Sequence, residues 1–344
     1  MPELAEVERA RSLIHERCLG MIVKEAHADE DKILFAGTNH EEFMNRITSE
    51  KIVGTGRHGK YFYVHLSNNA PTILMHFGMT GDIKFKGEKD EPIRVERFDM
   101  GEAWPPKYTK FWLHLVGDDG AECTLAFTDP RRLGRVRLID GDPETQPPLS
   151  QLGFDPILSP PKLSDFIKSV RKRQVPIKAL LLDQKFSSGV GNWIADEVLF
   201  QSQVHPAQYS NTLDDEQLET ILRNIIDICT QAVKCKADMR IFPKEWLFHY
   251  RWGKGKGIVC KLPDGRVITH ETIGGRTTAI VADVQKLNNN AGNGIEKKKR
   301  PTKKCKISVE SKISVVVKKE EDDYEIQTST RRSSRVKKRV SYIE

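Results

Sequence analysis

The chain has 344 residues, of which 30% are charged and 38% are apolar, and its formal net charge is +7. This composition excludes a membrane protein, and the length suits about two domains with sizeable cores, which excludes a small disulfide-stapled scaffold. The excess charge lies at the C-terminal end, because residues 1–296 hold 39 basic and 41 acidic residues whereas residues 297–344 hold 16 and 7. A nearly neutral folded part must therefore use a few placed cations if it binds a polyanion.

Residues 2–18 predict an amphipathic helix with Pro2 as its first residue, because apolar residues recur at helical spacing and acidic residues occupy the first turn. The acidic residues, with no apolar run beside them, also argue against a signal peptide, so we expect an intracellular protein. After this helix, and as far as about Ile139, short runs alternate apolar and polar residues, as half-buried strands do. These runs are Tyr61–Leu66, Thr72–Phe77, Phe111–Val116, Cys123–Phe127 and Arg135–Ile139. With a hairpin turn at Gly117-Asp118-Asp119-Gly120, this half is expected to be a β-sandwich or barrel.

Residues 141–161 are rich in Pro and Gly and predict a linker. The pattern then becomes helical, with Ser164 as the expected N-cap of the first helix. A buried helical stripe is predicted at Leu218, Ile221, Leu222, Ile225 and Cys229. The second half is therefore expected to be mostly α-helical.

After Pro243, two short strands are predicted at Ile258–Leu262 and Val267–His270, on either side of the turn Pro263-Asp264-Gly265-Arg266. From Asn288 onward, runs of Asn, Gly and Lys with few aromatic residues predict disorder. The six cysteines include no Cys-x2-Cys pair, which argues against a secreted disulfide framework and a paired-cysteine zinc site.

The N-terminus carries a chemical signal. If the initiator Met is removed, Pro2 becomes a free secondary amine, and with an α-amino pKa of about 7.7–8.0 roughly 10–20% of it is unprotonated at pH 7, against about 0.04% of an ordinary lysine. Such an amine can condense with a sugar aldehyde carbon to give a cationic iminium ion, and Glu3 could transfer protons at the same centre. Proline followed by an acid is also the ordinary start of a helix, so the pattern is not decisive alone.

Five segments taken together favour the catalytic interpretation of Pro2 over an ordinary helix start. Pro2-Glu3-Leu4-Ala5-Glu6-Val7-Glu8 resembles the start of the formamidopyrimidine-DNA glycosylase (Fpg/Nei) family, and four further segments match in the family's order between residues 2 and 287. These four lie at Gly56–Tyr61, at Met75–Gly81 with Asp129–Gly134, at Ile177–Glu197, and at Gly274–Ala279. The 288–344 tail lies outside the resemblance.

The resemblance implies an α+β multidomain fold. Residues 1–140 would form a catalytic β-sandwich domain with a leading N-terminal helix, residues 141–161 the linker, and residues 162–245 a helix-two-turn-helix DNA-binding domain. Residues 246–287 would form a β-hairpin finger and residues 288–344 a disordered basic tail. Because Cys260 stands alone where bacterial members use four zinc-binding cysteines, the finger resembles the zincless one of the plant and fungal branch, without metal.

The resemblance also assigns site residues. Pro2 would be the nucleophile and Glu3 the proton-transfer group, while Lys60 and Arg276 would contact phosphates and assist elimination. Asn192 would bind DNA phosphate beside Lys60, at a helix N-terminus. Two further basic residues match DNA-contact positions, Arg173 and Lys178. A lysine at a strand start, as Lys60 is, would otherwise be read as merely solvated.

Three residues would fill the space left by an extruded base: Met79, Arg131 and Leu133. Core packing is the commoner fate of a methionine such as Met79. Leu133 stands where bacterial members usually have Phe, so the resemblance does not fix the strength of stacking there. The segment between Asp238 and Trp246 is short where bacterial members carry a longer loop that closes over 8-oxoguanine, so we expect weak action on that base.

The implied function is a bifunctional DNA glycosylase and abasic-site lyase of base excision repair. It would act on damaged double-stranded DNA as a monomer, without a cofactor, and would remove formamidopyrimidines and further-oxidised guanines through a Pro2 Schiff base and β,δ-elimination. Two alternatives stay open, an endonuclease VIII-like enzyme for oxidised pyrimidines and a non-catalytic damaged-DNA-binding protein. Basic clusters in the tail, at residues 297–301 and 335–339, suit nuclear import or non-specific phosphate contact, and we expect a nuclear protein.

Overall fold

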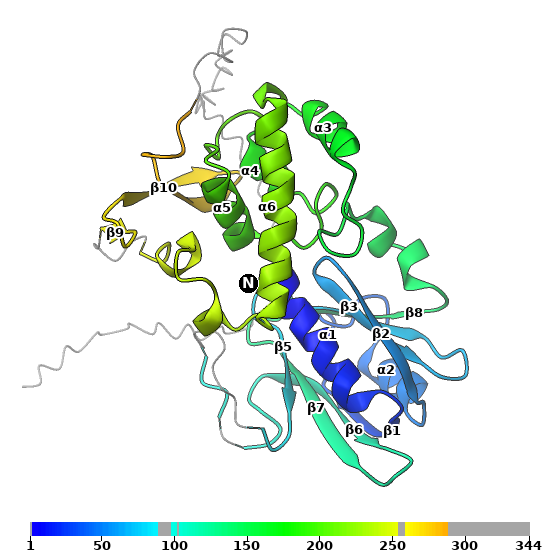
Figure 1. Ribbon diagram of the computed structural model, residues 1–344. Helices are drawn as coiled ribbons and strands as arrows, with labels where there is room; N and C mark the ends of the chain where they lie inside the picture. The colour runs from blue at the N-terminus through cyan, green and yellow to red at the C-terminus, as the bar shows by residue number, and fades with distance from the viewer. Residues whose placement is uncertain (1, 89–97, 102, 254–258, 288–344) are drawn as a thin grey trace, which may run out of the picture. The chain divides into compact units, whose positions relative to one another are not determined.

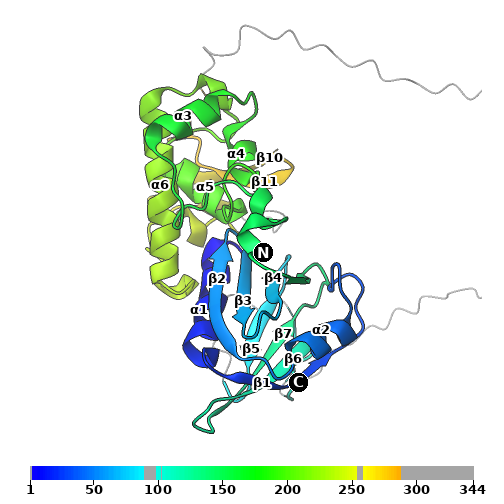
Figure 2. The ribbon, with the colours of Figure 1, turned by 90° about the vertical axis from the view of Figure 1, so that its right-hand side faces the viewer.

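The computed structural model describes residues 2–88, 98–101, 103–253 and 259–287 (Figure 1). Its N-terminal half contains two four-stranded antiparallel sheets, in the orders β1-β6-β7-β5 and β2-β3-β4-β8 (Figure 2). The strands are β1 (Ile22–Ala28), β2 (Ile52–His58), β3 (Tyr61–Leu66), β4 (Thr72–His76), β5 (Asp82–Phe85), β6 (Thr109–Val116), β7 (Glu122–Thr128) and β8 (Arg135–Ile139). The predicted turn at residues 117–120 joins β6 to β7, and the expected β-sandwich is confirmed.

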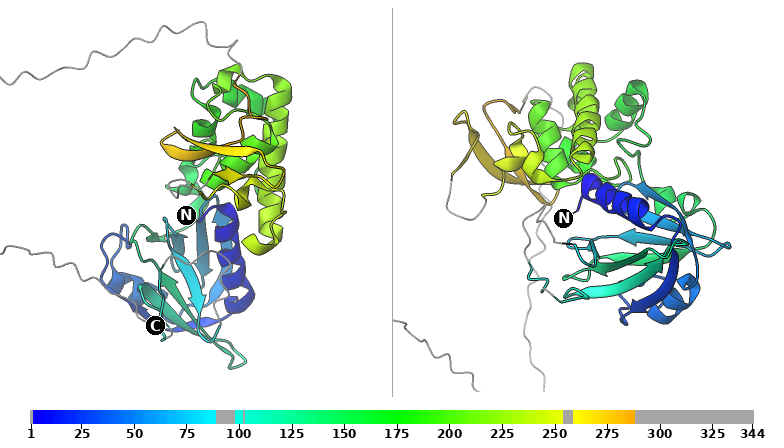
Figure 3. Two further views of the ribbon diagram at one scale, coloured as in Figure 1. Left: turned by 90° about the vertical axis from the view of Figure 1, so that its left-hand side faces the viewer. Right: turned by 60° about the horizontal axis from the view of Figure 1, so that its bottom comes forward.

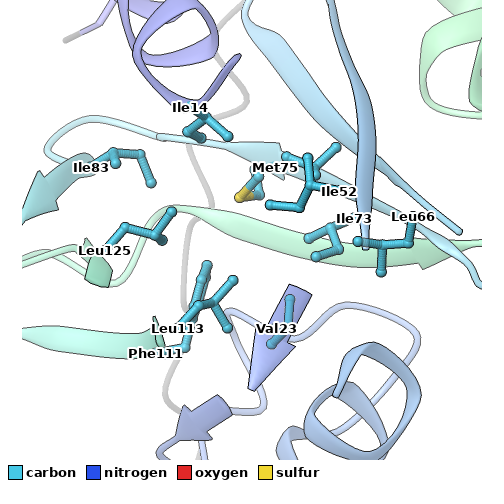
Figure 4. A pocket seen from close by; sticks show the side chains of 11 residues that line it. Ile14, Val23, Ile52, Leu66, Ile73, Met75, Ile83, Phe111, Leu113 and Leu125 are labelled. Atoms are coloured by element: carbon cyan, nitrogen blue, oxygen red, sulfur yellow. The ribbon is translucent and has the colours of Figure 1, made fainter. Parts of the chain in front are cut away.

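Apolar side chains from both sheets meet between them, together with Ile14 of the first helix (Figure 4). They line a small cavity that is wholly apolar. Its lining residues are Ile14, Val23, Ile52, Val64, Leu66, Ile73, Met75, Ile83, Phe111, Leu113 and Leu125. The cavity is the centre of the hydrophobic core of this half and offers no polar group to a ligand.

Helix α1 (Leu4–Cys18) belongs to two hydrophobic cores. Leu4 and Ala5 are buried among the helices of the second half, whereas Val7, Ala10, Ile14 and Cys18 are buried against the sheets. In Figures 1 and 3, α1 accordingly runs between the sheets and α6. The predicted domain boundaries therefore do not coincide with a separation of the cores, and they stay a prediction.

The start of α1 differs from the expectation. The helix begins at Leu4, and Glu3 is its N-cap with extended backbone angles, φ −114° and ψ −167°. The backbone N–H of Glu3 donates to Glu6 Oε2 at 3.0 Å, which caps the helix. Pro2 is therefore buried but stands outside the helix, one residue before the cap.

The second half is mostly helical. Its helices are α3 (Leu163–Arg171), α4 (Ile177–Leu182), α5 (Asn192–Gln201) and α6 (Asp215–Lys234), and the sheets carry one further helix, α2 (His40–Ile47). The predicted stripe on α6 is buried in full. Ser164 is not an N-cap, because α3 begins one residue earlier with Lys162 at the cap. The predicted linker holds two short 3-10 turns, η1 (Pro143–Thr145) and η2 (Leu149–Gln151), and the fully buried Asp155.

The chain after α6 passes through η4 (Met239–Ile241) and η5 (Leu247–His249) to a three-stranded antiparallel sheet in the order β11-β10-β9. Its strands are β9 (Cys260–Lys261), β10 (Val267–Ile273) and β11 (Arg276–Ile280). Part of the predicted strand Ile258–Leu262 and the whole predicted tail lie outside the described residues. No helix in the described part of the chain is both long and apolar enough to cross a membrane.

The carboxylate of Glu197 on α5 is hydrogen-bonded to the backbone of η5, and we predict that this group makes the stability of the protein depend on pH. Its buried carboxylate accepts backbone N–H bonds from Leu247 and Phe248 at 3.2 and 2.8 Å. Burial raises the pKa of Glu197 to about 7 from 4.5, although these hydrogen bonds and that from Gln201 oppose the rise. The native state then binds more protons than the unfolded state between pH 4.5 and 7, so this group lowers the free energy of unfolding as pH rises through that window.

The variant Glu197→Gln should remove this dependence, worth roughly 3 kcal/mol across the window. Urea unfolding of both proteins from pH 4.5 to 7.5 measures it, with the exposed Glu219→Gln on α6 as control. Parallel wild-type and Glu197→Gln curves would contradict the assignment.

Candidate active site and nucleic-acid interface

The Glu3 carboxylate is buried on the N-terminus of α5. Its Oε1 accepts from the Trp193 N–H at 3.0 Å and its Oε2 from the Ile194 N–H at 3.2 Å. These donors belong to the first turn of the helix, where backbone N–H groups have no helical partner and the dipole favours negative charge. Gly191 makes the approach possible, because a Cβ there would lie 2.2 Å from Glu3 Cδ. Glu3, which follows the predicted nucleophile Pro2, is thereby hydrogen-bonded to the helix-two-turn-helix segment that is predicted to bind DNA.

Burial raises the pKa of the Glu3 carboxyl above its ordinary 4.5. The charge of Lys60 opposes this rise and that of Glu6 adds to it, while the two backbone N–H groups favour the charged form. A carboxyl that retains its proton above its ordinary pKa is suited to give and take protons.

Lys60 occupies the turn between β2 and β3 and points toward the same helix. Its Nζ donates to the carbonyl oxygen of Val190 at 3.0 Å. Burial lowers the pKa of Lys60, the charge of Arg276 lowers it further, and the charges of Glu3 and Glu6 oppose both. The electrostatic coupling shows that the structure brings Glu3, Lys60 and Arg276 together, although they are far apart in the sequence.

A buried ion pair holds the turn that carries Lys60. Asp155 accepts from Arg57 Nη1 at 2.5 Å and from the Gly59 N–H at 2.8 Å, and Arg57 Nε donates to Glu8 Oε2 at 2.9 Å. Burial alone would raise the pKa of Asp155, but the Arg57 charge and these hydrogen bonds lower it. Sequence reasoning missed both residues. Arg57 lies inside the Gly56–Tyr61 segment, whereas nothing near Asp155 in the sequence indicates its partner.

The side chain of Asn192 is hydrogen-bonded to the backbone of the residue that follows Arg276. Asn192 is the first residue of α5, and its Nδ2 donates to Thr277 O at 2.9 Å. Arg276 is exposed and begins β11 directly after the Gly274-Gly275 turn, whose positive φ values of 60° and 72° suit glycine. The exposed Arg276 side chain therefore stands next to the helix N-terminus that holds Glu3.

The expectation that Lys178 contacts DNA is not met by its position. Lys178 is 0% exposed, and its Nζ donates to Asp196 Oδ1 at 2.5 Å, to Thr278 Oγ1 at 2.8 Å and to Thr277 O at 3.3 Å. A contact with a phosphate needs surface that this side chain does not have, since all its donors already have partners. Arg173 is exposed, and its role stays a prediction.

Met79, Arg131 and Leu133, the residues predicted to fill the space of an extruded base and called here the wedge residues, lie on two turns. Hydrogen bonds join these turns to each other. Thr80 Oγ1 donates to Asp129 Oδ1 at 2.6 Å, and the Arg131 N–H lies 3.2 Å from each of these oxygens. Asp129 Oδ2 also accepts from the Gly134 N–H at 2.7 Å. Arg131 is exposed, Leu133 is 40% exposed and Met79 is half-buried outside the core clusters, so core packing does not account for Met79. All three side chains have access to a ligand.

His76 connects these turns to the Lys60 site and was missed by sequence reasoning. Its Nδ1 accepts from the Gly78 N–H at 3.0 Å. Burial lowers the pKa of His76 to about 4, and the charges of Lys60 and Arg135 add to this. The imidazole is therefore neutral near pH 7, and the wedge turn begins next to it.

The finger region does not fit a structural zinc ion. Cys260 is its only cysteine, and it packs in a small cluster with Leu262 and Ile268. The region's histidines are already engaged, His249 with the carbonyl groups of Phe242 and Pro243 and His270 with that of Arg251. A zinc finger of this kind needs four such ligands in one place.

Known proteins are similar to this chain in sequence and in fold. Residues 1–136 match the formamidopyrimidine-DNA glycosylase N-terminal domain, and residues 152–242 match the formamidopyrimidine-DNA glycosylase H2TH domain. A formamidopyrimidine-DNA glycosylase of Arabidopsis thaliana is 41% identical over 307 residues, which are 88% of this chain and 75% of the relative. One from Heliobacterium modesticaldum is 31% identical over 301 residues, which cover 83% of this chain and 100% of the relative.

Solved structures agree in fold. The Lactococcus lactis formamidopyrimidine-DNA glycosylase bound to AP-site-containing DNA has a TM-score of 0.65 at 23% identity, over 83% of this chain and 99% of its own. The same bacterial protein in complex with Fapy-dG-containing DNA has a TM-score of 0.65 at 22% identity, over 83% and 100%.

The protein is thus a DNA glycosylase of base excision repair, with the expected α+β fold. More narrowly, the chain belongs to the formamidopyrimidine-DNA glycosylase family. The identity is higher with the Arabidopsis relative than with the bacterial one, in agreement with the plant-type branch expected from the finger.

Proposed function

We propose that this glycosylase removes oxidised purines from duplex DNA through the amine of Pro2 and then cuts the strand by β,δ-elimination. The observation that carries the proposal is the position of Glu3: next to Pro2, buried on the N-terminus of α5, and electrostatically coupled to Lys60. Pro2, once Met1 is removed, thus stands beside the groups that suit phosphate binding. Met1 itself lies outside the described residues.

In this mechanism the Pro2 nitrogen attacks the anomeric carbon of the deoxyribose, and the bond from that carbon to the damaged base breaks. Glu3 supplies and accepts protons at the sugar as the ring opens, and the product is an iminium ion between Pro2 and the sugar. The cation weakens the adjacent C–H bonds, so that loss of a proton expels the 3′ phosphate and a second loss expels the 5′ phosphate. Lys60 and Arg276 stabilise the leaving phosphates, and a one-nucleotide gap remains.

Borohydride trapping tests the nucleophile. Wild-type protein with a free Pro2 should form a covalent adduct with a duplex that contains an abasic site or an oxidised base, and Pro2→Gly should form far less. No adduct with the processed wild-type protein would overturn the catalytic proposal and favour a protein that only binds DNA.

We propose weak action on 8-oxoguanine and stronger action on formamidopyrimidines and further-oxidised guanines. Support comes from the segment between Asp238 and Trp246, where η4 is followed by Phe242, and Phe242 and Trp246 are 2% and 5% exposed in one aromatic cluster. These contacts leave little of the segment free to fold over a flipped base. Equal excision rates for 8-oxoguanine and formamidopyrimidine-guanine in matched duplexes would contradict the proposal.

Oxidised pyrimidines remain the second candidate substrate. One solved structure of the Lactococcus lactis protein, with 24% identity, holds DNA that contains an oxidised pyrimidine. The same lesion panel decides: faster excision of an oxidised pyrimidine than of formamidopyrimidine-guanine would favour the endonuclease VIII-like alternative.

We also propose a monomeric protein in the nucleus. The 16 basic residues among positions 297–344 support nuclear import. Deletion of residues 297–344 should reduce nuclear accumulation of a fluorescent fusion and spare strand cleavage, whereas unchanged accumulation would refute the import role. Light scattering of the full chain, free and with DNA, tests the monomer.

A further inference from the structure

The Asp196 carboxylate connects three segments that surround the predicted phosphate-binding residues. It is 0% exposed and lies on α5, one turn after Asn192. Its Oδ1 accepts from Lys178 Nζ of α4, and its Oδ2 accepts from the Ala279 N–H of β11 at 3.1 Å and from Arg251 Nη2. Figure 2 shows β11 beside α4 and α5, where these bonds join them.

Lys178 extends the connection to the residue that follows Arg276. Its ammonium group donates to Thr278 Oγ1 and to Thr277 O, and Thr277 O is also the acceptor for Asn192 Nδ2. Gly274, in the hairpin turn, comes so close to α4 that a Cβ would lie 3.0 Å from Ala179 Cα. The turn that carries Arg276 is thus held from two sides, by packing on α4 and by hydrogen bonds from Lys178.

The charges of the network explain why it stays assembled. A buried carboxylate facing two buried cations satisfies both of its oxygens, and a buried ion is stable only when it is paired and hydrogen-bonded. The position of the hairpin therefore depends on these polar contacts as well as on the small apolar cluster of Leu247, Leu262, Ile268, Ala279 and Val281.

We propose that Asp196 and Lys178 are positioning residues, which hold the hairpin so that Arg276 and Asn192 face the same DNA phosphates. The inference rests on the proposed function, since it concerns how the glycosylase grips its substrate. Lys178 acts through the Thr277 and Thr278 contacts and does not touch DNA. Loss of the contacts lets the hairpin move away from α5, which weakens substrate binding but leaves Pro2 and Glu3 in place.

The test uses Lys178→Met in the full chain, because this change removes the donors while Asp196 and Arg251 remain as a balanced pair. Strand cleavage of a duplex with one abasic site is measured over a range of DNA concentrations. We expect KM to rise about tenfold because the lost contacts act on binding, and kcat to fall by a smaller factor because Arg276 also stabilises a leaving phosphate. Borohydride trapping at saturating DNA counts the active fraction, so a variant that is only unstable shows lower kcat with unchanged KM.

Three further variants sharpen the result. Thr278→Val removes one partner of Lys178 at nearly constant volume and should raise KM by about two- to fivefold. Lys51→Met removes a lysine whose Nζ pairs with Asp118, at the other end of β2 from the Lys60 turn, and should leave KM unchanged. In an Arg276→Ala background, Lys178→Met should add little further loss, because both act through the same hairpin.

Unchanged KM in both Lys178→Met and Thr278→Val, or fully additive losses with Arg276→Ala, would overturn the inference. A wild-type protein that neither traps nor cleaves would instead overturn the proposed function. The two failures are distinguishable because the first requires an active wild type.

Discussion

Glu3→Gln is expected to slow excision of a damaged base by roughly 10²- to 10⁴-fold, the usual contribution of a positioned proton-transfer group. Glutamine keeps a similar shape and one acceptor oxygen toward the Trp193 N–H, so α5 retains most of its cap. What it loses is the ability to exchange a proton. Single-turnover excision of formamidopyrimidine-guanine measures the effect.

The pH profile separates this role from a structural one. Because the pKa of Glu3 is raised, its protonated form persists above pH 4.5, and excision that needs this form falls as pH rises through the raised pKa. Glu3→Gln should lose that limb of the profile. The neighbouring Glu6→Gln is the control and should retain the limb, shifted to lower pH because the charge of Glu6 contributes to the raised pKa of Glu3. A wild-type limb in Glu3→Gln would contradict the assignment.

Asp155→Asn should lower the free energy of unfolding by about 3–5 kcal/mol at pH 7, because it leaves the buried Arg57 guanidinium with only Glu8 to balance it. The pKa of Asp155 is lowered in the native state, so its stabilisation is present above pH 3.8 and is lost as pH falls through the native pKa. The difference between variant and wild type should therefore shrink toward low pH. Urea unfolding at pH 7 and pH 3 measures it.

The same substitution should also slow strand cleavage, because Asp155 holds the Gly59 N–H next to Lys60. For the stability measurement, Asp140→Asn is a matched control, because Asp140 forms an ion pair with Arg46 while its side chain is 72% exposed. This change should lower the free energy of unfolding by about 1 kcal/mol or less. An equally small decrease in the free energy of unfolding of Asp155→Asn would show that the buried ion pair does not hold the turn.

Local patterns predicted much of the secondary structure. The bounds of β3 and β8 agree with the predicted runs, and the α6 stripe is buried as expected, because alternation and helical spacing record directly which face of an element meets a core. The strands β1 and β5 and the helix α2 were not predicted. β5 and α2 are only four and eight residues long, too short for their spacing to stand out, and a register shift between Val23 and Glu25 interrupts the alternation of β1.

The candidate site likewise contains residues that the sequence predicted and one whose position the sequence did not indicate. Chain order and motif sufficed to point to Pro2, Glu3, Lys60, Asn192 and Arg276, and the structure brings Lys60 within electrostatic reach of both Glu3 and Arg276. The motif misplaced Lys178, because a basic residue in a DNA-binding segment carries no mark of burial. Its partner Asp196 lies 18 positions away, and Thr278 lies 100 positions away.

The residue types and their order along the chain therefore determined the class of chemistry, an amine beside a carboxyl with a few placed cations on a nearly neutral folded part. Only the tertiary structure decided which charged groups are exposed and which are buried in ion pairs that hold the protein together. Arg57, Lys178 and Arg276 are all cations within matched segments, yet two are buried in ion pairs and one is exposed. The reason is physical: desolvation must be offset by partners that are distant in sequence, and only folding brings those partners together.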